Sequence, residues 1–90
     1  MIPIVNMELK DTVDMMLSND YKERFKAEYY QTQIRYQNLH RIIIKHEAGT
    51  LGFELDTPIE RLKHQKSMMG QYLFDLEVRA EIKGIDLNWW

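Results

Sequence analysis

Basic side chains gather at two places in this chain of 90 residues, and they are its main candidates for binding chemistry. The first group lies beside Tyr21 and comprises Lys22, Arg24 and Lys26. Lysines next to an aromatic ring at the start of a helix can hold a phosphate and stack a base. A surface of solvated charges with a tyrosine in the core is the alternative interpretation, and the residues alone leave both open.

A second basic group follows residue 60, and one member stands where an apolar residue is expected. The group comprises Arg61, Lys63, His64 and Lys66, and Ser67 follows it. Acidic residues lie nearby, so most of this group also fits a mixed, solvated surface. Lys66, however, falls in an apolar seam at helical spacing, formed by Ile59, Leu62, Met69 and Leu73. A charge there is costly unless an anion or a carboxylate meets it. We therefore expect Lys66 to bind an anion at a subunit interface, with Ser67 as a further donor.

The sequence lacks the motifs of catalysis and metal binding. It has no glycine-rich phosphate loop, nucleophile elbow, paired metal-ligand motif or cysteine, and His40, His46 and His64 are scattered. We therefore expect no enzyme, no cofactor and no metal site. The net charge of −2 argues against wrapping a long nucleic acid. The apolar start at residues 1–5 has no basic leader, so we expect no signal peptide, no membrane span and a cytoplasmic location.

Two long helices are predicted to position these groups. The first runs from about Asp20 to Glu47, with Glu23 completing a capping box and Gly49 as a left-handed stop. The second runs from Pro58 to Lys83, with Thr57 as the cap and Glu60 completing the box. Gly84 and Ile85 then predict a Schellman end. The apolar seams are Phe25, Tyr29, Thr32, Tyr36, Leu39 and Ile43, and then Ile59, Leu62, Lys66, Met69, Leu73, Leu76 and Ala80.

The fold class that follows is all-α: an antiparallel two-helix hairpin over residues 20–87, with an arm at 1–19 and a tail at 88–90. The arm has apolar residues at helical spacing, Leu9, Val13, Met16 and Leu17, which predict a short helix near 7–17. It either packs on its own hairpin or reaches onto a neighbouring protomer. The loop at 50–57 carries Leu51, Phe53 and Leu55, and we expect it to fold back over the hairpin tip.

Several apolar residues lie off both seams, and they widen the apolar surface beyond what one hairpin covers. They include Tyr30, Ile34, Ile42, Met68, Tyr72 and Phe74. Isolated two-helix units are marginally stable in water, so we expect assembly into a helical homo-oligomer. Gly70 supports this weakly, because a glycine inside a helix costs about 1 kcal/mol against alanine and a close helix approach would offset that cost.

Two stretches carry a more specific pattern. They read Asp20-Tyr-Lys-Glu-Arg-Phe-Lys-Ala-Glu-Tyr29 and Leu62-x-x-Gln65-x-x-Met68-x-x-x-Tyr72-Leu73-x-x-Leu76-x-x-Arg79-Ala80-x-Ile82-x-Gly84-Ile85. This pattern, over residues 20–87, resembles a phage helical-hairpin family that is similar to the domain of the anti-CBASS and anti-Thoeris cyclic-nucleotide sponges. The resemblance implies a non-catalytic phage or prophage protein that forms oligomers, often hexamers. Such proteins sequester cyclic nucleotide immune signals in the infected bacterial cell.

The resemblance also implies site residues. Lys26 after Phe25 matches an early lysine of the sponges, and Lys66-Ser67 matches a basic residue followed by a small hydroxyl residue. The arm departs from the pattern, because residues 1–20 contain no aromatic residue to stack on a dinucleotide base. We expect a cyclic di- or trinucleotide to bind at Tyr21, Lys22, Lys26, Arg61, Lys63, Lys66 and Ser67. The alternative is an oligomeric helical interaction protein that blocks or scaffolds a host or virion protein.

Overall fold

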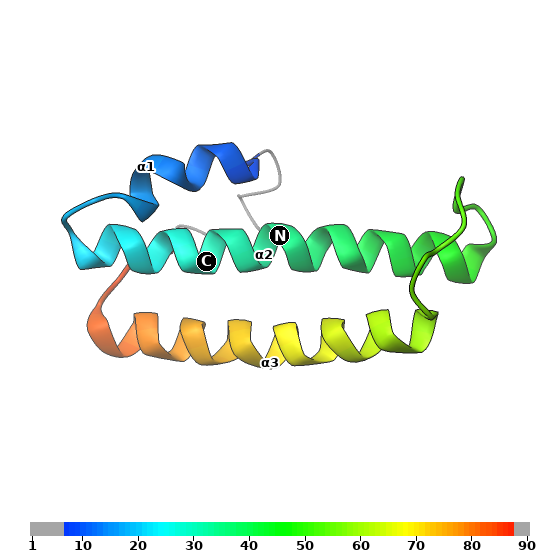
Figure 1. Cartoon of the computed structure of the whole chain (residues 1–90). Coiled ribbons are helices and arrows are strands. Elements are labelled where there is room, and N and C mark those ends of the chain that lie inside the picture. The colour runs from blue at the N-terminus through cyan, green and yellow to red at the C-terminus, as the bar shows by residue number, and fades with distance from the viewer. Residues whose placement is uncertain (1–6, 88–90) are drawn as a thin grey trace.

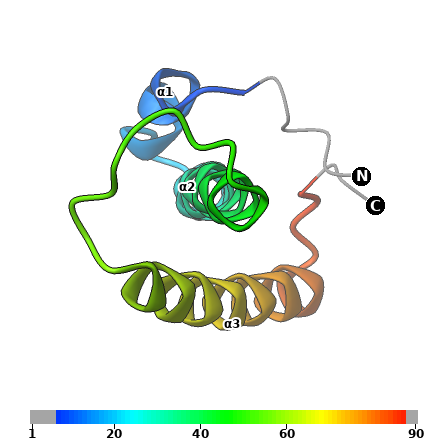
Figure 2. The same cartoon turned by 90° about the vertical axis from the view of Figure 1, so that its right-hand side faces the viewer.

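The computed structural model describes residues 7–87, and all regular structure in that range is helical, as predicted. A 3₁₀ turn, Leu9–Thr12, leads into the short helix α1, Val13–Met16, and the long helices are α2, Tyr21–Ala48, and α3, Ile59–Lys83. Helices α2 and α3 lie side by side and run in opposite directions, while α1 lies on the side of α2 away from α3 (Figures 1 and 2). Residues 1–6 of the expected arm and the expected tail at 88–90 lie outside the described residues.

Helix α2 begins and ends at the residues that the sequence indicates. The Asp20 carboxylate accepts a hydrogen bond of 3.0 Å from the Lys22 N–H. The expected capping box is not formed, because the Asp20 N–H donates to the Ser18 hydroxyl while Glu23 lies 3.8 Å from the Lys26 ammonium. At the other end Gly49 has φ 74°, the left-handed conformation that glycine adopts without strain.

The start of α3 corrects the sequence prediction, whereas its end confirms it. Pro58, not Thr57, is the N-cap, and the Thr57 hydroxyl donates to the Asp56 carboxylate instead of capping the helix. Proline has a fixed φ and no N–H, so it fits a helix start without a side-chain cap. At the end Gly84 has φ 68°, and the Ile85 N–H donates to the Ala80 carbonyl at 2.9 Å. These are the features of the predicted Schellman motif.

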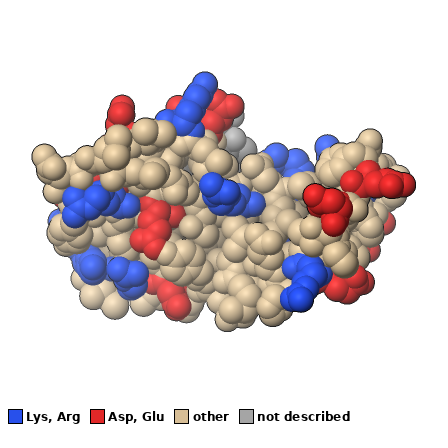
Figure 3. Space-filling model, viewed as in Figure 1, with Lys and Arg blue, Asp and Glu red and all other residues tan. Residues whose placement is uncertain are grey.

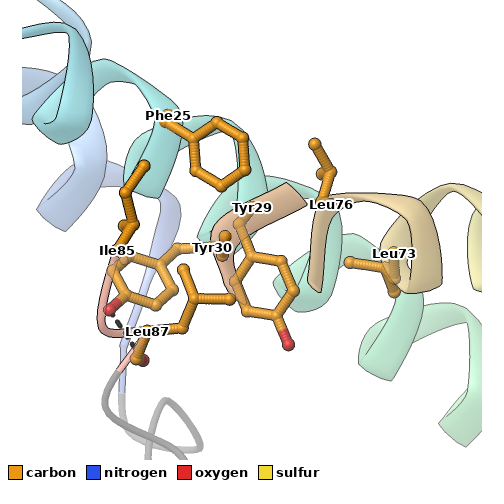
Figure 4. Packing of buried hydrophobic residues seen from close by; sticks show 8 residues of the cluster. Phe25, Tyr29, Tyr30, Leu73, Leu76, Ile85 and Leu87 are labelled. Carbon is orange, nitrogen blue, oxygen red and sulfur yellow. Dashed lines mark hydrogen bonds between the residues drawn. The ribbon is translucent and has the colours of Figure 1, made fainter. Parts of the chain in front are cut away.

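The hydrophobic core lies where α2 begins and α3 ends (Figure 4). It contains Phe25, Tyr29, Tyr30, Leu73, Leu76, Ala80, Ile85 and Leu87. The segment after α3 folds back over α2, and the Tyr30 hydroxyl donates to the Leu87 carbonyl at 2.9 Å. This return explains why Tyr30, which lies off the predicted seam, is buried. Toward the hairpin tip the seam of α3 is only half-buried, from Ile59 to Met69.

The arm packs on α2 with the opposite face from the one that its apolar pattern predicts. Its apolar residues Leu9, Val13, Met16 and Leu17 are all exposed. Thr12 is buried instead: its hydroxyl donates to the Leu9 carbonyl and accepts from Gln31 of α2 at 3.0 Å. The arm therefore contacts α2 through a hydrogen-bonded threonine of its 3₁₀ turn. In α1 the Met16 sulfur accepts from Gln31 and Met15 packs against the core, while Leu9, Val13 and Leu17 stay exposed.

The connecting loop covers the tip less fully than expected. Leu51 and Leu55 are half-buried, but Phe53 is 59% exposed. Phe53 nonetheless lines a shallow pocket at the tip together with His46 of α2 and Ile59 of α3. No helix between residues 7 and 87 combines the length and apolar character needed to cross a membrane.

Candidate functional site

An open groove of about 790 Å³ runs along the α2–α3 contact, and it contains Lys66. Helix α2 contributes Tyr36 and Ile43, and helix α3 contributes Lys63, Lys66, Ser67, Gly70, Gln71, Phe74 and Asp75. Three of the seven residues predicted for a ligand site therefore line one groove: Lys63, Lys66 and Ser67. The groove combines cationic, hydroxyl and aromatic groups, the types that bind a nucleotide's phosphate and base.

Lys66 is half-buried and packs on an aromatic ring. Its ammonium lies 5.7 Å from the centroid of the Tyr36 ring, a cation–π distance. No ion pair joins Lys66 to a carboxylate anywhere in residues 7–87. Contact with a ring replaces lost hydration only in part, typically by about 0.5–2 kcal/mol. The Lys66 ammonium therefore lacks a counter-charge at the groove wall, where an anion can complete its surroundings.

The Tyr36 ring stacks with a second aromatic ring on α2. Tyr36 and His40 lie one turn apart, with parallel rings at an interplanar angle of 3° and centroids 6.4 Å apart. The Nδ1 atom of His40 is buried and has no hydrogen-bond partner among the described residues. The four-residue spacing of Tyr36 and His40 could have indicated this pair of rings from the sequence, because residues four apart share a helix face.

The charge of Lys63 is offset by an acidic neighbour across the hairpin tip. Its ammonium pairs with the Glu47 carboxylate. The hydrogen bond from Lys63 lowers the pKa of Glu47, and the same bond raises the pKa of Lys63. Both side chains are well exposed, so the pair adds little to stability. Arg61 is exposed and does not line the groove. Of the second basic group, Lys66 is thus the cation best placed to meet a ligand.

Part of the first basic group makes contacts within the chain. The Lys83 ammonium lies 5.5 Å from the centroid of the Tyr21 ring, so a protein cation occupies a ring that was expected to stack a base. Lys26 pairs with Glu23 at 3.8 Å, while Lys22 is exposed. Arg79 also lies at this end of the molecule, with its guanidinium 5.1 Å from the Phe25 ring centroid. The sequence analysis did not place Arg79 and Lys83 among the basic residues at this end. The antiparallel return of α3 brings them beside the start of α2.

The two predicted groups do not meet in one chain. Lys26 and Tyr36 are ten residues apart on α2, or about 15 Å along the helix axis. Figure 3 shows Lys and Arg atoms at the end where α2 begins and α3 ends, with Asp and Glu atoms among them. A mixed, solvated surface therefore describes Lys22 and Arg61, and the groove at Lys66 is the candidate site. Residues 7–87 hold no cluster of three His, Asp or Glu side chains that would suit a metal.

A comparison with protein families identifies the helical core. The family model described as Sequestin matches residues 19–82. The chain belongs to the Sequestin family. The family name points to sequestration and names no ligand, which agrees with the expected resemblance to sequestering, sponge-like proteins at that level. Comparison with curated proteins and with solved structures finds no match.

The Sequestin match includes α2, all of α3 except its last residue, and the whole groove, together with the Asp20 cap. It excludes the arm at residues 7–17 and the segment after α3 that covers Tyr30. The family assignment therefore rests on the part of the chain that contains Lys66.

Proposed function

We propose that this Sequestin protein binds a cyclic di- or trinucleotide immune signal and sequesters it without cleavage, as a phage anti-defence protein in the cytoplasm of an infected bacterium. The observation that carries the proposal is Lys66: a half-buried ammonium on an aromatic ring, without a carboxylate partner in the described chain, facing an open groove. A phosphodiester supplies the missing negative charge. The neighbouring Ser67 adds a hydroxyl donor.

The dimensions and chemistry of the groove support this ligand class. Its volume of about 790 Å³ lies within the usual range for small-molecule sites, about 300–1,000 Å³. Phe74 can contact a base while Lys66, which packs on the Tyr36 ring, contacts phosphate. The sponge resemblance implies sequestration, so the proposal is binding without hydrolysis.

Calorimetry on Lys66→Met tests the site. Methionine suits an apolar seam, so the variant should match or exceed the parent in thermal stability. It should lose binding to every cyclic di- and trinucleotide that the parent binds. Lys45→Met, which removes an exposed lysine of α2 outside the groove, is the matched control and should bind normally. Equal affinity of Lys66→Met and the parent would disprove the assignment of Lys66.

A thermal-shift panel of cyclic nucleotides tests the function itself. Binding to the native state alone stabilises it by about 2.7 kcal/mol at a ligand concentration one hundred times the dissociation constant. We expect at least one cyclic di- or trinucleotide to raise the melting temperature of the parent. A panel without any shift would count against nucleotide sequestration.

We also propose that the protein is a homo-oligomer, with a hexamer as the assembly implied by the sponge resemblance. Large apolar side chains outside the groove remain exposed on the arm and on both long helices; they include Leu9, Val13, Met16, Leu17, Tyr21, Ile44, Met68, Tyr72, Val78 and Ile82. A neighbouring chain would cover them, and it would be needed to bring a Lys26 close to a Lys66. Light scattering at micromolar concentration should give several times 10.9 kDa. A folded monomer would refute this assembly.

The same exposed surface favours one alternative function, an oligomeric helical interaction protein that blocks or scaffolds a host or virion protein. Phe74, Val78 and Ile82 are exposed at four-residue spacing on one face of α3, and a contiguous apolar patch is typical of an interaction site. The thermal-shift panel separates the two functions. An oligomer that responds to no cyclic nucleotide would favour the interaction protein.

A further inference from the structure

The groove contains a second cation, Lys63, and a carboxylate of the chain already holds it. Lys63 and Lys66 both line the groove and are three residues apart on α3, so their side chains are neighbours on the helix surface. The two lysines differ in their partners. The Lys66 ammonium lies over the Tyr36 ring, whereas the Lys63 ammonium pairs with the Glu47 carboxylate near the end of α2. One cation of the groove is therefore open to a ligand, and the other is occupied.

The pair of Lys63 with Glu47 can exchange its partner easily. The Lys63 side chain is 48% exposed and the Glu47 side chain is 58% exposed. Neither side chain takes part in another ion pair within residues 7–87. Water and salt weaken an exposed ion pair, so a more highly charged anion can displace the carboxylate. Lysine carries a point charge on a flexible stem, and its ammonium can therefore turn to a new acceptor without a shift of the helix.

The charges along the groove place phosphates at its lysine end. Asp75 lines the groove twelve residues after Lys63, or about 18 Å further along the helix axis. A carboxylate repels phosphate, whereas Lys66 attracts it and Ser67 adds a hydroxyl donor. A first phosphate at Lys66 leaves Lys63 as the nearest further cation of the groove. A ligand with a second phosphate brings that lysine an acceptor that competes with Glu47.

We propose that Lys63 is the second phosphate-binding residue of the groove, and that Glu47 competes with the ligand for it. This inference rests on the proposed function and narrows its ligand to nucleotides with at least two phosphates. A ligand with one phosphate contacts Lys66 and leaves the pair of Lys63 with Glu47 intact. A ligand with two or more phosphates displaces Glu47 and gains a second contact. The groove therefore favours cyclic di- and trinucleotides over cyclic mononucleotides.

Calorimetric titration tests the competition, with cyclic tri-adenylate, cyclic di-AMP, cyclic AMP and tripolyphosphate as the probes. Glu47→Gln removes the competing charge of the carboxylate. It should tighten binding of the probes with two or more phosphates by about twofold to fivefold, the range expected for an exposed ion pair. Glu28→Gln is the matched control, because it makes the same change in net charge at an exposed position of α2 outside the groove. It should bind every probe like the parent.

Lys63→Met removes the second cation itself. It should weaken binding of the probes with two or more phosphates by about tenfold and leave cyclic AMP unaffected. The double variant of Lys63→Met with Glu47→Gln should bind like Lys63→Met alone, because no lysine remains for the glutamate to hold. This comparison separates competition for Lys63 from a general repulsion of anions by Glu47.

An NMR titration of Glu47 gives a readout that a purely structural ion pair would not change. In the free protein the hydrogen bond from Lys63 lowers the pKa of Glu47. Cyclic tri-adenylate that takes Lys63 away should raise this pKa toward its usual value. Saturating cyclic AMP should leave the pKa of Glu47 low, because one phosphate at Lys66 does not disturb the pair.

The possible outcomes separate this inference from the proposed function. If the parent binds a cyclic di- or trinucleotide and Lys63→Met binds it equally well, Lys63 is not a phosphate-binding residue, although sequestration stands. Equal affinity of Glu47→Gln and the parent would overturn the competition. If no cyclic nucleotide binds to the parent, the proposed function fails, and tripolyphosphate with the same variants still decides whether Glu47 and an anion compete for Lys63. A parent that binds no tripolyphosphate either would overturn this inference as well.

Discussion

Tyr29→Phe removes a single hydroxyl from the centre of the α2–α3 contact. Tyr29 is 0% exposed, and its hydroxyl donates to the Glu77 carboxylate at 2.7 Å and accepts from the Gln33 amide at 3.0 Å. Burial and the bond to Glu77 hold the pKa of Tyr29 well above its usual value, so the hydroxyl stays protonated and remains a donor. Phenylalanine keeps the ring and its apolar contacts. The substitution therefore isolates the two hydrogen bonds.

The expected loss of stability follows from the partners of that hydroxyl. A hydrogen bond to a charged group contributes about 1.5–3 kcal/mol, and a neutral one about 0.5–1.5 kcal/mol. Glu77 is only half-buried, so water replaces part of its lost bond and the lower values apply. We expect the free energy of unfolding to fall by about 2 kcal/mol. For a domain of this size that corresponds to a decrease of about 10 °C in Tm.

Urea denaturation at a fixed protein concentration measures this change, because the stability of an oligomer depends on concentration. Tyr21→Phe, at a half-exposed ring, is the control and should alter stability by less than about 0.5 kcal/mol. A double-mutant cycle with Glu77→Gln should give a coupling energy of at least about 0.5 kcal/mol. If Tyr29→Phe is as stable as the parent, the buried network does not contribute to the helix pairing.

Three further results are expected. Gly84→Val should destabilise the fold by about 1–2 kcal/mol in thermal unfolding, since a Cβ is strained at φ 68°, and unchanged melting would mean that the helix continues. Lys63→Ala should raise the pKa of Glu47 in an NMR titration, because it removes the hydrogen bond that lowers this pKa. The pair stabilises the fold above the pKa that Glu47 has in the unfolded chain, and this stability is lost as the pH falls through the pKa of Glu47 in the folded protein. Thr12→Val should loosen the arm by about 1 kcal/mol, seen as faster hydrogen exchange, because its buried hydroxyl bonds are lost.

The ends of the long helices could be located from short stretches of sequence. Asp20, Gly49 and Gly84 act through hydrogen bonds to residues within five positions, so their neighbours in the chain decide the result. The wrong prediction of Thr57 as the N-cap of α3 also has a local cause. Its hydroxyl could bond either to the helix or to Asp56, and the pattern of residue types does not distinguish these local partners.

The face that each element buries was harder to predict. In the arm, periodicity identified the apolar stripe from Leu9 to Leu17 correctly but could not show which way it faces. The arm lies on α2 through Thr12 of its 3₁₀ turn, and Gln31 of α2 supplies the hydrogen-bond partner that makes this burial favourable. Tyr30 is a similar case: it is buried by a segment 57 residues further along the chain.

For the site, Lys66 was found because a charge in an apolar seam is conspicuous in the sequence itself. Its lack of a carboxylate partner in the described chain, and the occupation of Tyr21 by Lys83, are results of the pairing of α2 with α3. The sequence alone determined the helices, their ends and the unusual position of Lys66, because these depend on local propensity and spacing. Only the tertiary structure decided which cations are paired and which residues of α2 and α3 line the groove, because those depend on contacts between residues far apart in the chain.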